Sequence, residues 1–214
     1  TLRLAKVAKE FGSEVAGAIM FTLSPVHTDE YYADKADKLS ESDDIDTILL
    51  YDTAGVLEKE RLVTLLPAIK SKSHGKPIEF HSNNLLGQSA KAYLDAIDLG
   101  VSILHTAVRP MANGPSVPSV EIMARNVELL GHTHNLDSTL FPPVAEHFEK
   151  VGKAAGFLVN QSAEYDVLSI RHQVPGGMVG TLKAQLVQNG MSDRLDEVLQ
   201  ETAAVRKELG YPGM

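Results

Sequence analysis

The sequence contains neither cysteine nor tryptophan. The absence of cysteine excludes disulfides and zinc sites built from thiolates, and it is typical of a cytoplasmic protein. No apolar run approaches the ~20 residues that a membrane-spanning helix needs, so no membrane span is expected. The chain starts at Thr1, inside a helical pattern, and we therefore expect it to be part of a longer polypeptide.

Basic residues are also scarce. Lys and Arg total 20 against 28 Asp and Glu, which gives a net charge of −8. Binding of nucleic acid without sequence preference needs a basic face, so this function is not expected. The 214 residues, of which 43% are hydrophobic, are enough for one large or two small globular domains.

Four short apolar segments are spaced like the strands of a parallel sheet. An amphipathic stretch at helical spacing follows each, and Thr28 is placed to cap the first of these helices. This alternation predicts βαβ units, and because a closed (β/α)₈ barrel needs eight of them, it indicates half a barrel or a small open sheet. The predicted strands are Val15–Phe21, Ile45–Tyr51, Ile78–His81 and Val101–His105, and the predicted helices are Leu2–Phe11, Thr28–Ser40, Glu58–Ser71, Ser89–Leu99 and Ser119–Leu130.

The pattern changes after Gly131, where no further parallel strand is predicted. We therefore predict two domains, residues 1–131 with the strands and residues 132–214 with helices only. A His132-x-His134 pair lies in the connection between them, where a metal-binding role is not expected. The predicted helices of the second part are Phe141–Gly156, Thr181–Asn189 and Asp193–Leu209, the last capped by Ser192, and Ile170–Gly180 is predicted to be a Pro- and Gly-rich loop.

Polar side chains follow each predicted strand. The carboxyl ends of parallel strands lie on one rim of the sheet, where α/β folds build their sites. We therefore expect these side chains to lie within reach of a common ligand. They are Thr22 and Ser24 after the first strand, Tyr51, Asp52 and Thr53 after the second, His81, Ser82 and Asn83 after the third, and His105 and Thr106 after the fourth.

Six stretches of the sequence resemble a known family. Their order and spacing are similar to the second half of the biotin-dependent carboxyltransferase domain shared by pyruvate carboxylase, the oxaloacetate decarboxylase α subunit and the transcarboxylase 5S subunit. The last two resemble the helical extension that follows the barrel in this group. The stretches are SPVHTDEYY (24–32), YDTAGVL (51–57), HSNNLLG (81–87), HTAVRPMANGPSVPSVE (105–121), HQVPGGMVGTLKAQL (172–186) and DRLDEVLQETAAVRKELGYP (193–212).

The resemblance implies an α/β fold: the C-terminal half, four βα units, of a TIM (β/α)₈ barrel, followed by an α-helical extension. It implies a carboxyltransferase or decarboxylase that acts on a small 2-oxo acid, pyruvate or oxaloacetate, with biotin. A divalent metal at the barrel mouth would polarise the keto acid and stabilise its enolate. Biotin is expected on a carrier domain or subunit. The missing barrel half is expected from the rest of the polypeptide or from another subunit, in a homo-oligomer.

Several residues depart from the site that the resemblance implies. The family's carbamylated Lys aligns with Tyr51, the second His of its H-x-H with Asn83, and an Asp near the eighth strand with His105. The Thr that passes a proton between biotin and the enolate aligns with Pro115, which has no hydroxyl. Three possibilities stay open: an active enzyme, a non-catalytic scaffold or assembly subunit, and an enzyme with changed chemistry.

The rim still carries groups able to bind or react. His81 and Asn83 are the predicted metal ligands, for Zn, Mn or Co, with Asp52 as a possible anionic partner. Tyr51 and His105 are the predicted catalytic acid–base pair.

Two further residues are predicted to contact the substrate. They are Ser116, in the loop that contains Pro115, and Asp52, for which a place among the metal ligands stays open.

Overall fold

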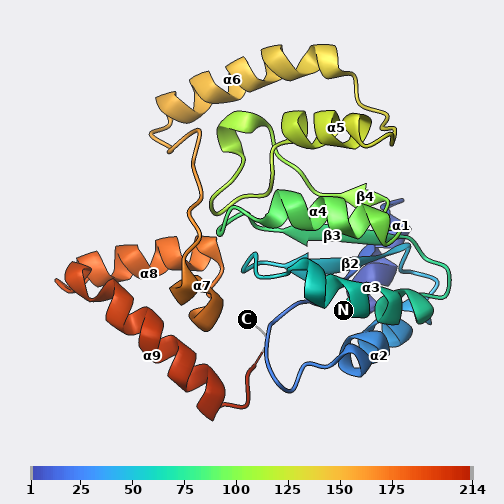
Figure 1. Cartoon of the computed structure of the whole chain (residues 1–214), viewed down its shortest axis with the longest axis horizontal. Coiled ribbons are helices and arrows are strands. Elements are labelled where there is room, and N and C mark those ends of the chain that lie inside the picture. The colour runs from blue at the N-terminus through green and yellow to red at the C-terminus, as the bar shows by residue number, and fades with distance from the viewer. Residues whose placement is uncertain (1, 213–214) are drawn as a thin grey trace.

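The structure, a computed structural model, describes residues 2–212. Over this range four strands alternate with helices up to β4, and only helices follow (Figure 1). In chain order the elements are α1 (Leu2–Glu10), β1 (Ala16–Met20), α2 (Asp29–Ser40), β2 (Thr47–Asp52), α3 (Lys59–Ser71), β3 (Ile78–Ser82), α4 (Ser89–Asp98), β4 (Ile103–Leu104), η1 (Arg109–Met111), α5 (Val120–Leu129), η2 (Ser138–Leu140), α6 (Phe141–Ala154), α7 (Val167–His172), α8 (Gly176–Gln188), η3 (Ser192–Arg194) and α9 (Leu195–Glu208).

The four strands are all parallel and lie in the order β1-β2-β3-β4. The helices between them pack as neighbours, α2 against α3 and α3 against α4. A doubly wound open sheet reverses its strand order and carries helices on both faces, whereas a barrel adds each βα unit in sequence. The sequential order therefore agrees with half of a TIM barrel and not with a small doubly wound sheet.

Burial alternates along each strand and separates two faces of the sheet. Ile48, Leu50 and Phe80 are fully buried under the helices. On the other face, Ala16, Ala18 and Met20 of β1 are exposed. In a closed barrel this second face lines the interior, so its residues are the ones that another barrel half would cover.

The predicted strands and the first helix cap are confirmed, with one strand shorter than expected. The Oγ1 atom of Thr28 accepts a hydrogen bond from the amide of Tyr31 at 3.3 Å, as its capping role predicts. The strand predicted at Val101–His105 is reduced to Ile103–Leu104. β4 pairs with β3 only at Ile103 and Leu104, opposite Glu79 and Phe80.

Two predictions about the C-terminal part are wrong. The segment Ile170–Gly180 is not a loop, because α7 continues to His172 and α8 begins at Gly176, so only Gln173–Pro175 separate the two helices. Pro and Gly stand here at the start of a helix, where a missing amide hydrogen or side chain is tolerated. Ser192 does not cap the last helix, since it opens the 3₁₀ turn η3 that leads into α9.

The last helix is attached to the loop after β1 by a buried arginine. The Nη2 atom of Arg206 donates to Thr22 Oγ1 at 2.6 Å, and its Nη1 atom donates to the carbonyl of His172 at 3.3 Å. Gln173 accepts from Thr22 Oγ1 at 3.1 Å and from the amide of Leu23 at 2.8 Å. These bonds hold α7–α9 at the carboxyl ends of the strands, where Figure 1 shows them grouped.

Candidate active site at the carboxyl ends of the strands

Three aromatic side chains meet on the inner face of the sheet. Tyr51 of β2 pairs in register with His81 of β3, and their rings contact edge to face with centroids 4.5 Å apart. His105 follows β4, and its ring lies 5.3 Å from that of His81, also edge to face. The expectation that these strand ends lie together is therefore met for Tyr51, His81 and His105.

A chain of hydrogen bonds passes through the two histidines. Glu79 Oε2 lies 2.8 Å from His105 Nε2, and His105 Nδ1 lies 3.2 Å from His81 Nδ1. His81 Nε2 lies 2.9 Å from Asn83 Oδ1, and Asn83 Nδ2 donates to the carbonyl of Thr53 at 2.9 Å. Both ring nitrogens of each histidine are therefore engaged.

Glu79 was missed at the level of sequence, although a signal was present. It stands two residues before His81 in the strand PIEFHS, so both side chains point to the same face. An acid at an alternating position of an otherwise apolar strand needs a polar partner, and the structure supplies it through His105 and Thr47, whose hydroxyl donates to Glu79 at 2.5 Å. Glu79 thus belongs to the site as a partner of His105.

The environment of His81 favours its neutral form. Burial lowers the pKa of this imidazole, the hydrogen bond to Asn83 acts in the opposite direction, and the charge of nearby His105 lowers the pKa further. A neutral ring has one N–H and one lone pair. His81 is accordingly a donor at one nitrogen and an acceptor at the other.

Asp52 points away from Tyr51 and the two histidines, because it follows Tyr51 in the strand and so lies on the opposite side of the sheet. Its carboxylate is fully buried and accepts bonds from the amides of Val56 and Leu57, at 3.2 and 2.9 Å, and from Ser82 Oγ at 3.0 Å. Burial raises the pKa of this carboxyl, and these bonds oppose the change. Asp52 thus organises the turn after β2, and its placement does not bring it to the inner face as a substrate contact or metal ligand.

A cavity of about 540 Å³ lies beside Tyr51 and His81. Ser116 lines it, as expected for a substrate contact, whereas His105 and Asp52 do not. The far wall comes from the first turn of α8. The barrel side of the lining consists of Tyr51, Thr53, His81, Asn83, Pro115, Ser116 and Val117, and the α8 side of Pro175, Gly177 and Met178.

The loop that carries Pro115 and Ser116 is fixed to the end of β3. The amide of Asn84 donates to the carbonyl of Ser116 at 2.7 Å, and the side-chain amide of Asn84 donates to Asn113 Oδ1 at 2.8 Å. Pro115 has no hydroxyl, but Ser116, the next residue in the loop, also lines the cavity. The loop therefore places a hydroxyl-bearing residue at the cavity.

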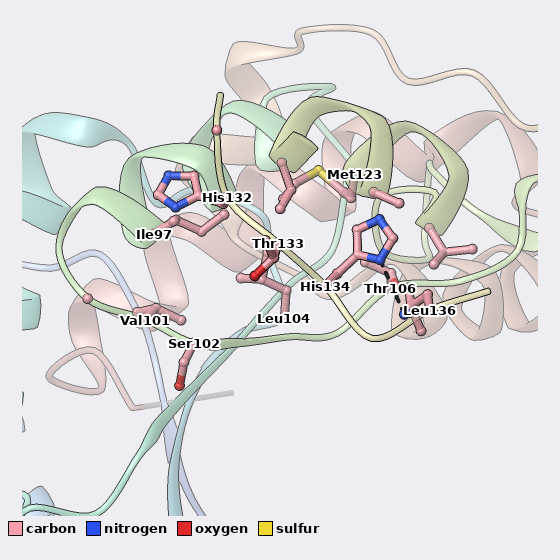
Figure 2. Close-up of a pocket in the computed structure, with 15 residues that line it drawn as sticks. Ile97, Val101, Ser102, Leu104, Thr106, Met123, His132, Thr133, His134 and Leu136 are labelled. Atoms are coloured by element: carbon pink, nitrogen blue, oxygen red, sulfur yellow. Dashed lines mark hydrogen bonds between the residues drawn. The ribbon is translucent and has the colours of Figure 1, made fainter. Parts of the chain in front are cut away.

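A larger pocket, of about 640 Å³, lies elsewhere, at the β4 edge of the sheet (Figure 2). Leu104 and Met123 contribute to its mostly apolar wall, and Figure 2 shows His132 and His134 at opposite ends of it. The Nε2 atom of His134 lies 3.2 Å from a carboxylate oxygen of Glu128. That His132 and His134 bind no metal therefore stays a prediction.

The residues at the barrel mouth do not fit a divalent metal as they are arranged. No cluster of three or more His, Cys, Asp and Glu side chains suited to a metal occurs in residues 2–212. Each nitrogen of His81 already has a hydrogen-bonding partner, and the oxygen of Asn83 faces one of them. A metal at His81 and Asn83 would have to break both contacts. The assignment of these two residues as ligands stays a prediction that this geometry does not favour.

Comparisons with known proteins place the chain in a family. The model of a conserved carboxylase domain matches residues 170–213. A pyruvate carboxylase subunit of Methanocaldococcus jannaschii is 36% identical over 97% of this chain. The methylmalonyl-CoA carboxyltransferase 5S subunit of Propionibacterium freudenreichii is 32% identical over 95% of it. The chain belongs to the biotin-dependent carboxyltransferase family.

The fold agrees with a solved member of this carboxyltransferase family. The structure of the carboxyl transferase domain of Rhizobium etli pyruvate carboxylase with pyruvate and biocytin superposes with a TM-score of 0.89, at 22% identity, over 99% of this chain. The chain spans 36% of that structure, 36% of the archaeal protein and 40% of the 5S subunit. The TIM-barrel type of fold is confirmed, and no helix in the described part of the chain is long and apolar enough to cross a membrane.

Proposed function

We propose that the chain forms part of a carboxyltransferase that moves a carboxyl group between carboxybiotin and a small 2-oxo acid. The observation that carries this proposal is the composition of the cavity beside Tyr51. Its lining combines residues at the strand ends with residues at the start of α8, which lies in the segment that matches the carboxylase family model. A substrate held at the strand ends would therefore meet a biotin group admitted along the extension.

The reaction needs one proton transfer and one exchange of bonds. A proton leaves the carbon next to the keto group, that carbon forms a bond to the carboxyl carbon of carboxybiotin, the C–N bond to biotin breaks, and biotin takes up a proton. Tyr51 and Ser116, whose side chains carry hydroxyls, both line the cavity. Both can donate to a developing enolate oxygen or carry the proton.

No step here passes through a metal, because the donor set of His81 and Asn83 does not fit one. Run in reverse, the same sequence moves the carboxyl group of oxaloacetate to biotin and leaves pyruvate, and decarboxylation is completed when carboxybiotin then releases CO₂ and takes up a proton. A biotin carrier, the other half of the barrel and a homo-oligomeric, cytoplasmic assembly are the partners and setting that we propose. These partners and this setting are inferred from the family to which the chain belongs, and not from a contact in this chain.

The test is transfer activity in an assembly that contains this chain, the polypeptide that completes its barrel and a biotin carrier. Pyruvate-dependent loss of carboxybiotin is measured, as is oxaloacetate decarboxylation. Tyr51→Phe and Ser116→Ala should each lower kcat by about 100-fold, the usual effect of losing a general acid or base. Tyr31→Phe, on the exposed side of α2, is the matched control and should leave kcat unchanged. Absence of turnover with either substrate would refute the proposed activity.

A non-catalytic role is the second candidate, favoured by the proline at position 115, which cannot relay a proton. Restoring the family residues with Tyr51→Lys, Asn83→His and Pro115→Thr tests it. Turnover that appears only in the restored protein would establish the scaffold role. Equal turnover in the restored and unaltered proteins would exclude it.

A further inference from the structure

Arg206 of α9 is a buried arginine without an acidic partner in the described part of the chain. The residue is only 4% exposed, and none of the ion pairs within residues 2–212 includes it. Its guanidinium contacts neutral oxygens, namely Thr22 Oγ1 at 2.6 Å and the carbonyls of His172 and Arg171 at 3.3 and 3.4 Å. Its Nε atom is buried and has no hydrogen-bonding partner among the described residues.

This arrangement leaves a positive charge only partly compensated. A guanidinium is always charged and offers five N–H donors. Burial of such a charge costs free energy that neutral acceptors recover only in part. Burial lowers the pKa of the Arg206 guanidinium, and no carboxylate of residues 2–212 opposes this change. The group that matches both the charge and the unpaired Nε–H is a carboxylate, which can accept two parallel hydrogen bonds from a guanidinium.

The position of Arg206 indicates the side from which a carboxylate can approach. Its partner Thr22 lies two residues beyond the end of β1, and Figure 1 shows the end of α9 beside the loop that leaves this strand. Within residues 2–212, β1 pairs only with β2, so its other edge is open. In a closed barrel that edge pairs with a parallel strand of the other half. The carboxyl end of this strand would therefore lie beside Thr22 and Arg206.

A second feature of the same edge also favours an acidic partner. A cavity of about 390 Å³ lies along β1, and its charged lining residues are Lys35 and Lys38 of α2, with His27 beside them. No acidic side chain of the described residues lines it, although the chain has a net charge of −8. Burial and then the charge of Arg206 lower the pKa of His27, so the cavity and the buried arginine are close enough to interact.

We propose that the open edge of β1 is an interaction surface for an acidic segment of the polypeptide that completes the barrel, and that one carboxylate of this segment pairs with Arg206. Lys35 and Lys38 attract further acidic side chains of the same partner. Because Arg206 belongs to α9, this ion pair attaches the C-terminal extension to the other half of the barrel as well as to the loop after β1. The proposal depends on the half-barrel fold and not on the reaction that the active-site cavity supports.

Double-mutant cycles in the complete assembly test the ion pair. The Asp and Glu residues at the carboxyl end of the strand that pairs with β1 are changed one at a time to Asn or Gln, with and without Arg206→Met. One of these changes should lower the urea midpoint of the unaltered chain, but leave it unchanged or raise it in Arg206→Met. Arg194→Met, which removes an exposed ion pair with Glu197, is the control background and should preserve the full effect. Absence of such a coupled acid would overturn the proposal.

Charge reversal on α2 is a second measurement, which leaves Arg206 in place. Lys35→Glu combined with Lys38→Glu should lower the urea midpoint of the complete assembly, and high salt should reduce this effect because exposed charges are screened. Lys183→Glu, at an exposed position of α8 outside the cavity along β1, is the control and should have a smaller effect. An unchanged or raised midpoint in the double variant would refute an acidic partner at this edge.

A small anion is the other possible source of the carboxylate, and acetate is the probe that tests it. Acetate should not raise the unfolding temperature of the complete assembly, because a carboxylate of the partner already occupies Arg206. A rise with acetate that Arg206→Met abolishes would show that Arg206 binds a free anion, and the proposal would be wrong. These measurements do not use turnover, so a failure of the proposed carboxyl transfer is recognised separately.

Discussion

Gly176, the first residue of α8, is where the extension comes closest to the Pro115 loop. A Cβ atom at this position would lie 2.6 Å from Pro115 Cβ and 2.8 Å from Leu85 Cδ2. Carbon atoms at optimal separation are about 3.5–4.0 Å apart, so Gly176→Ala must move α8 away from the loop by about 1 Å. We expect this overpacking to cost about 1–3 kcal/mol of stability.

The same displacement should affect turnover more strongly than stability. Gly176 stands between Pro175 and Gly177, which line the cavity. A displacement of about 1 Å at a catalytic site can lower the rate about 100-fold. We therefore expect kcat/KM for carboxyl transfer to fall by roughly two orders of magnitude in Gly176→Ala.

Gly180→Ala in the same helix is the control. Nothing lies within 4 Å of the position that its Cβ would occupy. Alanine is favoured over glycine inside a helix by about 1 kcal/mol, so this variant should unfold at a slightly higher temperature and keep its activity. The unfolding temperature and the carboxyl-transfer activity of Gly176→Ala and Gly180→Ala are measured and compared. If Gly176→Ala behaves like Gly180→Ala, the packing of α8 against the loop is refuted.

Three further outcomes are expected, each measured by urea or thermal unfolding. Gly55→Ala should cost more than the ~1 kcal/mol of a left-handed alanine, because its Cβ would lie 2.1 Å from a backbone oxygen of the loop after β3. Gly12 has a similar positive φ and nothing within 4 Å of the position that its Cβ would occupy, so Gly12→Ala should lose only about 1 kcal/mol of stability. If both variants lose the same free energy of unfolding, the close approach at Gly55 is contradicted. Arg206→Ala should lose about 2 kcal/mol of stability, because its hydrogen bonds are buried. Arg194→Ala removes an exposed ion pair and should leave stability nearly unchanged; a larger loss for Arg194→Ala than for Arg206→Ala would refute the role given to Arg206. Burial lowers the pKa of His172 in the folded protein, so the neutral ring fits the fold. Its contribution to the free energy of unfolding is complete above the pKa of an unfolded-state histidine, about 6.5, and is lost as the pH falls below that value. His172→Gln should reduce this loss of stability at low pH. The prediction is contradicted if the unaltered protein is more stable at pH 5.5 than at pH 7.5.

Several features of the site follow from local sequence rules. Side chains alternate between faces along a strand. This alternation places Glu79 and His81 on one face and turns Asp52 away from Tyr51, although neither consequence was among the predictions. Ser116 lines the cavity, because the Pro115 loop follows the fourth strand at the rim, and its contact with substrate stays a prediction.

The course of the chain after His172 was less predictable. Gly176 and Gly177 suggest a loop by composition, but at the start of a helix glycine and the preceding Pro175 are tolerated, and packing against Pro115 favours a residue without a side chain. Tertiary contact therefore overrides the local preference. Ser192 likewise lies two residues too early to cap α9, because a 3₁₀ turn is inserted.

The sequence by itself determined the parallel βα units, the capped helix at Thr28, the polar ends of the strands and the family. These depend on periodicity, capping and motifs that each involve neighbouring residues. Only the tertiary structure decided that His81 meets His105, that His105 meets Glu79 and that α8 lines the cavity, since these contacts join separate elements. Their distances depend on strand register and helix packing, which no local pattern encodes.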